Sequence, residues 1–222
     1  MAEVRSTCGK DTSITIVGHS IGGWVARGYL AERPQVLAKV NVIATLGSPN
    51  RTPPEGTLWA TADQTRGLLK SVNAKWRALG VDARPPKTLC VVGRGTSAGL
   101  VGTVWDEASG RSPLLEGIVA LVSYLALCGD GVGTFGDGLI PTAAAVVDVG
   151  GDDATEVVVV ELEGCNHAGF VPTPGLSLQL PKTYEWYGSA KQLTKWLPEL
   201  QTSSPIERPI SRRSQVLLAP PQ

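Results

Sequence analysis

The sequence has few histidines and cysteines and no net charge, and each shortage excludes a class of function. Two histidines and four cysteines without a C-x-x-C pair give no cluster of metal ligands, so we predict neither a metal site nor a cofactor. Equal numbers of basic and acidic residues, 20 of each, argue against nucleic acid as a partner. The widely spaced cysteines favour a reduced, intracellular setting, and a pairing between Cys128 and Cys165 stays open.

The sequence also lacks a hydrophobic run long enough to cross a bilayer. The longest apolar stretch, 114–128, contains Glu116 and Gly117, and we predict a buried helix there instead of a transmembrane segment. Residues 1–11 are polar and lack the apolar segment of a signal peptide. We therefore expect an intracellular protein, in the cytoplasm, or in a plastid if a targeting segment precedes residue 1.

The residues that are present centre on a G-x-S-x-G motif. The motif spans residues 18–22, directly after a short apolar strand, 14–17, and directly before a predicted helix, 23–32. A strand before and a helix after are the context in which this motif forms a sharp turn that exposes the serine hydroxyl. The sequence therefore predicts that Ser20 is a nucleophile.

The neighbours of Ser20 have predicted roles in the same turn. The turn accepts only small residues two places before and after the serine, so we expect a Cβ atom at Gly18 or Gly22 to clash. The first N–H groups of the following helix point toward the serine hydroxyl, where negative charge would develop. We predict that the backbone N–H of Ile21 belongs to an oxyanion hole.

Apolar runs and segments of helical periodicity alternate along the chain. This alternation predicts an α/β fold with a mostly parallel sheet and flanking helices. We predict one domain over 1–201 and a disordered tail, rich in Ser, Pro and Arg, over 202–222. Strands are predicted over 14–17, 40–46, 88–93 and 156–162, and helices over 23–32, 63–79, 112–127, 141–147 and 190–200.

A serine nucleophile needs a base and an acid, and the chain offers few candidates. His19 adjoins Ser20, where its side chain should point away from the hydroxyl, so His167 is the candidate base. It follows the last predicted strand, at the sheet edge where open α/β sheets keep their sites. The acid normally lies between serine and histidine in sequence. Asp137, anchored by the following Leu-Ile-Pro, is favoured over Asp130.

Six short motifs follow one another along residues 13–200. They are Val17-Gly18-His19-Ser20-Ile21-Gly22-Gly23-Trp24-Val25-Ala26-Arg27, Thr45-Leu46-Gly47-Ser48-Pro49, Thr65-Arg66-Gly67-Leu68-Leu69, Gly136-Asp137-Gly138-Leu139-Ile140-Pro141, Gly164-Cys165-Asn166-His167 and Trp186-Tyr187-Gly188-Ser189. Together they resemble the lipase-like α/β-hydrolases of plants and algae, which are related to the GPI inositol-deacylase (PGAP1-like) group. The resemblance implies hydrolysis of a carboxylic ester, from a small molecule or a lipid, by Ser20, Asp137 and His167.

The chain departs from that family at its start. An α/β-hydrolase places its serine turn after the fifth strand, whereas only about a dozen residues precede the strand 14–17 here. We therefore expect the chain to be the C-terminal portion of a hydrolase, lacking the first strands and one oxyanion donor. That strand would become an exposed edge through which the chain self-associates. Loss of one oxyanion donor typically lowers the rate by about 10²–10³.

A second class of function stays open beside the enzyme. A truncated relative with a weak or inactive site would act as a binding or interaction protein. Retention of Ser20, Asp137 and His167 together argues against this alternative, because an inactive site has no need of all three. Reaction with a serine-directed fluorophosphonate distinguishes the two classes.

Overall fold

The computed structural model describes the chain in segments. These are residues 13–55, 65–79, 85–102, 106, 112–129, 131–148, 155–168 and 185–201, together with the backbone of 170–173, 176–179 and 215–217. Asp130, the alternative acid, lies outside the described residues, as does most of the segment 202–222.

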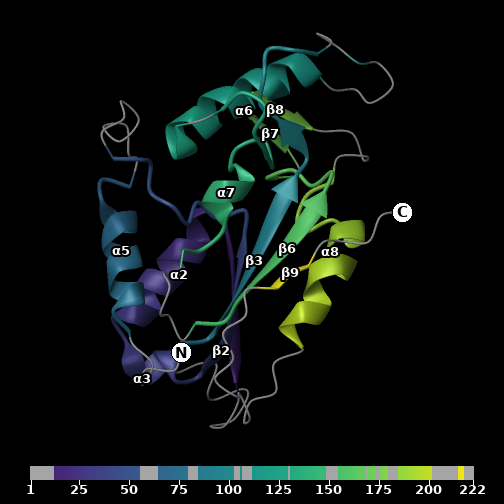
Figure 1. Cartoon of the computed structure of the whole chain (residues 1–222). Coiled ribbons are helices and arrows are strands. Elements are labelled where there is room, and N and C mark those ends of the chain that lie inside the picture. Colours follow the sequence, from purple (N-terminus) through teal and green to yellow (C-terminus); the bar gives the residue numbers. More distant parts are fainter. Residues whose placement is uncertain are drawn as a thin grey trace.

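A parallel β-sheet runs through the centre of the molecule (Figure 1). Its strands are β1 (Ile14–His19), β2 (Val40–Leu46), β3 (Lys87–Arg94), β6 (Val157–Glu163) and β9 (Gln215–Leu217), and they lie side by side in this order. Each pairing between neighbours is parallel. The first four strands are those that the apolar runs predicted, so the predicted α/β fold with a mostly parallel sheet is confirmed.

β9 is an addition to the predicted strands. It falls within 202–222, a segment whose composition predicted disorder, and the structure instead pairs residues 215–217 with β6. An unpaired strand edge presents a row of N–H and C=O groups, and a short segment that pairs with it satisfies them.

Side chains alternate between the two faces of the sheet and fill a core on each side. Val91 packs on one face in the same cluster as Trp196. Ile43 points to the opposite face, where it packs with Leu30 and Trp76. Because both faces are covered, the central strands are buried along almost their whole length, which explains their near-continuous apolar sequences.

The helices lie on both sides of this sheet (Figure 1). One face carries α2 (Ile21–Ala31), α3 (Pro34–Leu37) and α5 (Leu68–Arg77), and the other carries α8 (Ala190–Trp196) with the 3₁₀ turn η2 (Leu197–Leu200). α6 (Pro113–Cys128) lies beyond the carboxyl ends of β3 and β6, and α7 (Thr142–Ala145) is shorter than the predicted helix. In the part of the chain that the structure describes, no helix is long and apolar enough to span a bilayer.

Two small antiparallel pairs were not predicted. β4 (Thr96–Ser97) pairs with β5 (Phe135–Gly136), and β7 (Phe170–Thr173) pairs with β8 (Leu176–Gln179). Strands of two residues are too short to show an alternating pattern, so periodicity does not detect β4 and β5. β5 matters for the site because it ends immediately before Asp137.

Candidate active site

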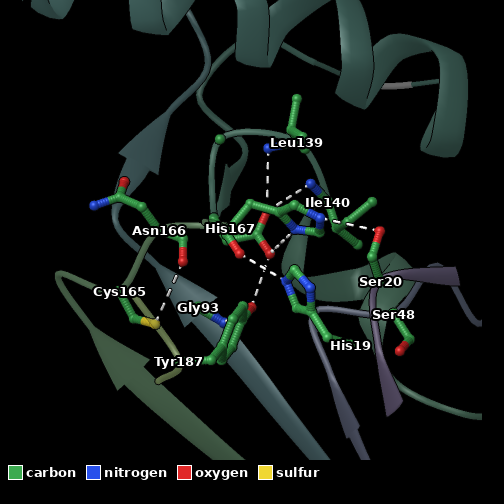
Figure 2. A network of polar contacts seen from close by, with 12 residues as sticks. His19, Ser20, Ser48, Gly93, Leu139, Ile140, Cys165, Asn166, His167 and Tyr187 are labelled. Carbon is green, nitrogen blue, oxygen red and sulfur yellow. Dashed lines mark hydrogen bonds and ion pairs between the residues drawn. The ribbon is translucent and has the colours of Figure 1, made fainter. Parts of the chain in front are cut away.

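Ser20 occupies the turn between β1 and α2, as the motif predicts (Figure 2). Its backbone has φ 55° and ψ −129°, a combination that non-glycine residues rarely adopt. The Ser20 N–H donates to the carbonyl oxygen of Leu46 at 3.0 Å, which ties the turn to the carboxyl end of β2. The backbone is therefore held in a strained conformation by its neighbours.

The glycine positions that have no room for a Cβ atom differ in part from those predicted. A Cβ atom at Gly18 would lie 2.6 Å from backbone atoms of Gly22 and Gly23, so the expected clash is confirmed there. At Gly22 the expectation is wrong, because no atom of the described residues lies within 4 Å of such a Cβ. The tight position is Gly23, where a Cβ would lie 2.1 Å from the Oγ of Ser48.

The structure brings Ser20, His167 and Asp137 into one hydrogen-bonded chain. His167 Nε2 lies 3.0 Å from Ser20 Oγ, and His167 Nδ1 lies 2.8 Å from Asp137 Oδ2. Since the carboxylate can only accept, the imidazole proton lies on Nδ1 in the neutral ring, and Nε2 is left to accept the serine proton. This arrangement is the one by which a histidine activates a hydroxyl nucleophile.

Asp137 is held in place by its own loop. Its carboxylate oxygen Oδ1 accepts hydrogen bonds from the N–H groups of Leu139, at 3.0 Å, and Ile140, at 2.7 Å. Its backbone oxygen accepts from the N–H of His167 at 2.7 Å. Asp137 is 1% exposed, so these bonds replace the water that a buried carboxylate would otherwise lose. The predicted anchoring by the residues after Asp137 takes this form.

The comparison with known families agrees with this architecture. The family model of the PGAP1-like alpha/beta domain matches residues 4–103. This part of the chain is similar to the PGAP1-like alpha/beta domain. The predicted resemblance to that group is thereby confirmed, and the parallel sheet with its flanking helices agrees with an α/β-hydrolase fold. Neither the curated proteins nor the solved structures compared with the chain gave a match.

The PGAP1-like match and the hydrogen-bonded chain overlap only in part. Ser20 lies inside the matched residues, together with the strands β1, β2 and β3. Asp137 and His167 lie beyond residue 103. The family match therefore indicates a hydrolase-like protein, whereas Asp137 and His167 are candidates for the acid and the base from their position and contacts alone.

His19 contacts His167, the candidate base, through the backbone and through the ring (Figure 2). Its Nε2 donates to the backbone oxygen of His167 at 2.7 Å, and the two imidazole rings lie 4.7 Å apart between centroids. Partial burial lowers the pKa of His19, and the neighbouring His167 lowers it further. Of the two imidazoles, it is that of His167 that contacts the Ser20 hydroxyl, as the sequence predicted.

Tyr187 is the residue at this site whose role sequence reasoning missed. Its hydroxyl donates to Asp137 Oδ2 at 2.8 Å and accepts from the N–H of Gly93 at 2.8 Å. Tyr187 belongs to one of the family motifs, but neither its spacing nor its neighbours indicated a contact with Asp137. The sequence held only an indirect signal. Two glycines, Gly47 after β2 and Gly93 in β3, leave space beside the tyrosine hydroxyl.

The remaining predictions about the site concern the oxyanion donor and the cysteines. Ile21 is the first residue of α2, which is the position that the predicted donor requires, and its role stays a prediction. Neither Cys128 nor Cys165 forms a disulfide, so the pairing that was left open does not occur. Among the described residues, no group of three His, Cys, Asp or Glu side chains lies together as a metal site requires.

Proposed function

We propose that this chain is a serine hydrolase that cleaves a carboxylic ester of a small molecule or a lipid. The single observation that supports it most is the unbroken contact from Ser20 Oγ through His167 to Asp137. A second supporting observation is the strained backbone of Ser20, which lifts the hydroxyl out of the turn. Each of these features is demanded by acyl transfer and by few structural roles.

The proposed reaction proceeds in two halves. Ser20 Oγ attacks the ester carbonyl carbon while His167 Nε2 takes its proton, and the imidazolium is stabilised by Asp137. The same proton then passes to the departing alkoxide, which leaves an acyl-enzyme on Ser20. Water, deprotonated by His167, hydrolyses the acyl-enzyme and restores the hydroxyl.

The negative charge on the carbonyl oxygen needs donors in the transition state. The N–H of Ile21 and the amino-terminal end of α2 supply one such donor and a favourable dipole. We include Ile21 in the proposal on this ground. If it acts alone, the expected rate is about 10²–10³ below that of a site with two donors.

Fluorophosphonate labelling of the purified chain tests the proposal. The reagent phosphonylates only an activated serine, so wild-type protein is expected to label and Ser20→Ala is expected not to label. Ser71→Ala is the matched control, because Ser71 is an exposed serine on α5, and this variant should label like wild type. Hydrolysis of p-nitrophenyl acetate and of a longer-chain ester, measured in parallel, distinguishes small esters from lipid-like ones.

Two outcomes would overturn the proposal. A folded wild-type protein that neither labels nor hydrolyses either ester would favour a binding protein with an inactive site. Labelling that persists in Ser20→Ala would assign the reactive serine to another position. Circular dichroism of each preparation separates these outcomes from a loss of folding.

A further inference from the structure

Tyr187, labelled in Figure 2, is a completely buried tyrosine, 0% exposed. Its hydroxyl contacts the carboxylate of Asp137, the candidate acid. The hydroxyl lies 2.8 Å from Asp137 Oδ2, the same oxygen that accepts from His167 Nδ1. Oδ2 therefore accepts two hydrogen bonds, one from the base and one from Tyr187. A change in the hydrogen bond from Tyr187 must therefore alter the negative charge on Oδ2 that acts on His167.

The direction of the Tyr187 hydrogen bond is fixed by a backbone group. The N–H of Gly93 donates to the hydroxyl oxygen at 2.8 Å, so the hydroxyl proton is left to point at Asp137. Burial holds the pKa of Tyr187 well above its usual range, and the charge of Asp137 raises it further. The hydroxyl therefore stays protonated and remains a donor.

Glycines in or after two neighbouring strands leave room for the Tyr187–Asp137 pair. A Cβ atom at Gly47, after β2, would lie 2.6 Å from the Tyr187 hydroxyl oxygen and 2.4 Å from Asp137 Oδ2. At Gly93, in β3, it would lie 2.9 Å from the same hydroxyl and 2.8 Å from Asp137 Cβ. Two neighbouring strands thus lack a side chain where the pair sits.

The backbone of Tyr187 is held by α8, which packs in the same core cluster as the Tyr187 ring. Its carbonyl oxygen accepts from the indole N–H of Trp196, in α8, at 3.0 Å. Trp196 is itself buried in that cluster. The position of the hydroxyl is therefore set by the packing of α8, more than 50 residues along the chain from Asp137.

We propose that Tyr187 is a positioning residue for the acid–base pair, which holds the Asp137 carboxylate in orientation and draws part of its charge away from His167. This inference rests on the proposed hydrolase function for its effect on rate. A hydrogen bond to a carboxylate stabilises its negative charge. Without the Tyr187 hydroxyl, the full charge of Oδ2 would act on the imidazole and favour its protonated form.

The substitution Tyr187→Phe removes the hydroxyl alone and keeps the ring. We expect kcat for ester hydrolysis to fall by about tenfold, because hydrogen bonds to charged groups are among the stronger ones. KM should change little, since Tyr187 is completely buried and offers no surface to a substrate. The acidic limb of the pH–rate profile should move to higher pH, because the imidazole then holds its proton more tightly.

Tyr124→Phe is the matched control. Tyr124 is also 0% exposed, and its hydroxyl accepts from the N–H of Gly138, next to Asp137 in the same loop. Its single hydroxyl proton is donated to the backbone oxygen of Thr96 at 3.3 Å, whereas that of Tyr187 is donated to the Asp137 carboxylate. If Tyr187 acted only by supporting the loop, the two variants would behave alike, and neither would move the acidic limb.

A titration by NMR keeps this inference separate from the proposed function. The chain has only two histidines, so the His167 imidazole signals are assigned by comparison with His19→Gln. We expect the titration midpoint of His167 to rise in Tyr187→Phe and to stay unchanged in Tyr124→Phe, in active or inactive protein. A midpoint that is unchanged or lowered in Tyr187→Phe would overturn the inference, whereas failure of fluorophosphonate labelling would overturn only the hydrolase function.

Discussion

Alanine substitution at two neighbouring glycines, Gly22 and Gly23, measures how tightly the Ser20 turn is packed against the sheet. Both positions lie in the first turn of α2, so each substitution brings the same gain in helix propensity, about 0.5–1 kcal/mol. The surroundings differ. No described atom lies within 4 Å of a Cβ at Gly22, whereas a Cβ at Gly23 would lie 2.8 Å from the Cβ of Ser48 and 2.9 Å from Cγ2 of Thr45.

The difference between the two variants isolates the packing cost, because the helix term cancels. Ser48 is completely buried and its Oγ donates to the Gly18 oxygen at 3.4 Å, so it has no free space to move into. Forcing an extra methyl group into such a place typically costs about 1–3 kcal/mol. For a chain of this size each kcal/mol lowers the melting temperature by about 2–4 °C. We therefore expect Gly23→Ala to melt about 2–12 °C below Gly22→Ala.

Differential scanning calorimetry of the two variants and the wild type measures this difference. Gly22→Ala should melt at or slightly above the wild-type temperature, and Gly23→Ala below it. Equal melting temperatures would mean that the turn is loosely packed. A lower value for Gly22→Ala would restore the expectation that the motif glycine is the constrained one.

Three further predictions concern the surroundings of the site. Since the pKa of His19 is lowered by burial, the folded chain binds fewer protons there than the unfolded chain, and stability falls as the pH drops below about 6.5. His19→Gln keeps an N–H donor, so urea titrations between about pH 7 and pH 5 should show a smaller loss than in wild type; an equal loss would refute this. Gly47→Ala should abolish fluorophosphonate labelling, and Gly67→Ala should not, because Gly67 also has a positive φ but no atom of the described residues lies within 4 Å of a Cβ added there. Burial raises the pKa of the Cys165 thiol, so iodoacetamide should modify the half-buried Cys128 first and Cys165 only after unfolding. Mass spectrometry measures the order of modification, and early reaction of Cys165 would contradict its burial.

The central fold could be predicted because its signals are local. Val40–Leu46 and Val157–Glu163 are apolar almost throughout, and a parallel strand covered on both faces requires that sequence. Ser20 was found for the same reason, since the turn, the strand before it and the helix after it are contiguous in sequence. These sequence patterns can be recognised without knowing which distant segments pack against them in the folded chain.

The contacts that depend on distant segments were not predictable. The motif names Gly22, but successive helix residues point about 100° apart, and only the position of Ser48 decides that Gly23 faces the sheet. Tyr187 lies in a short turn before α8 without apolar periodicity, so nothing local connects it with Asp137. Asp137 itself was favoured on its flanking residues, and its contact with His167 is a property of the folded chain.

The order of the strands has a consequence for how the protein is made. β1, β2, β3 and β6 lie in the sheet in the order in which they are synthesised, so each new strand finds its neighbour already exposed. Ser20 and His167, however, are 147 residues apart. At a translation rate of about 5–20 residues per second, His167 is synthesised about 7–30 s after Ser20. Nascent chains stalled before His167 should therefore carry a formed sheet edge and an unreactive serine, so labelling of Ser20 would report completion of the fold during translation.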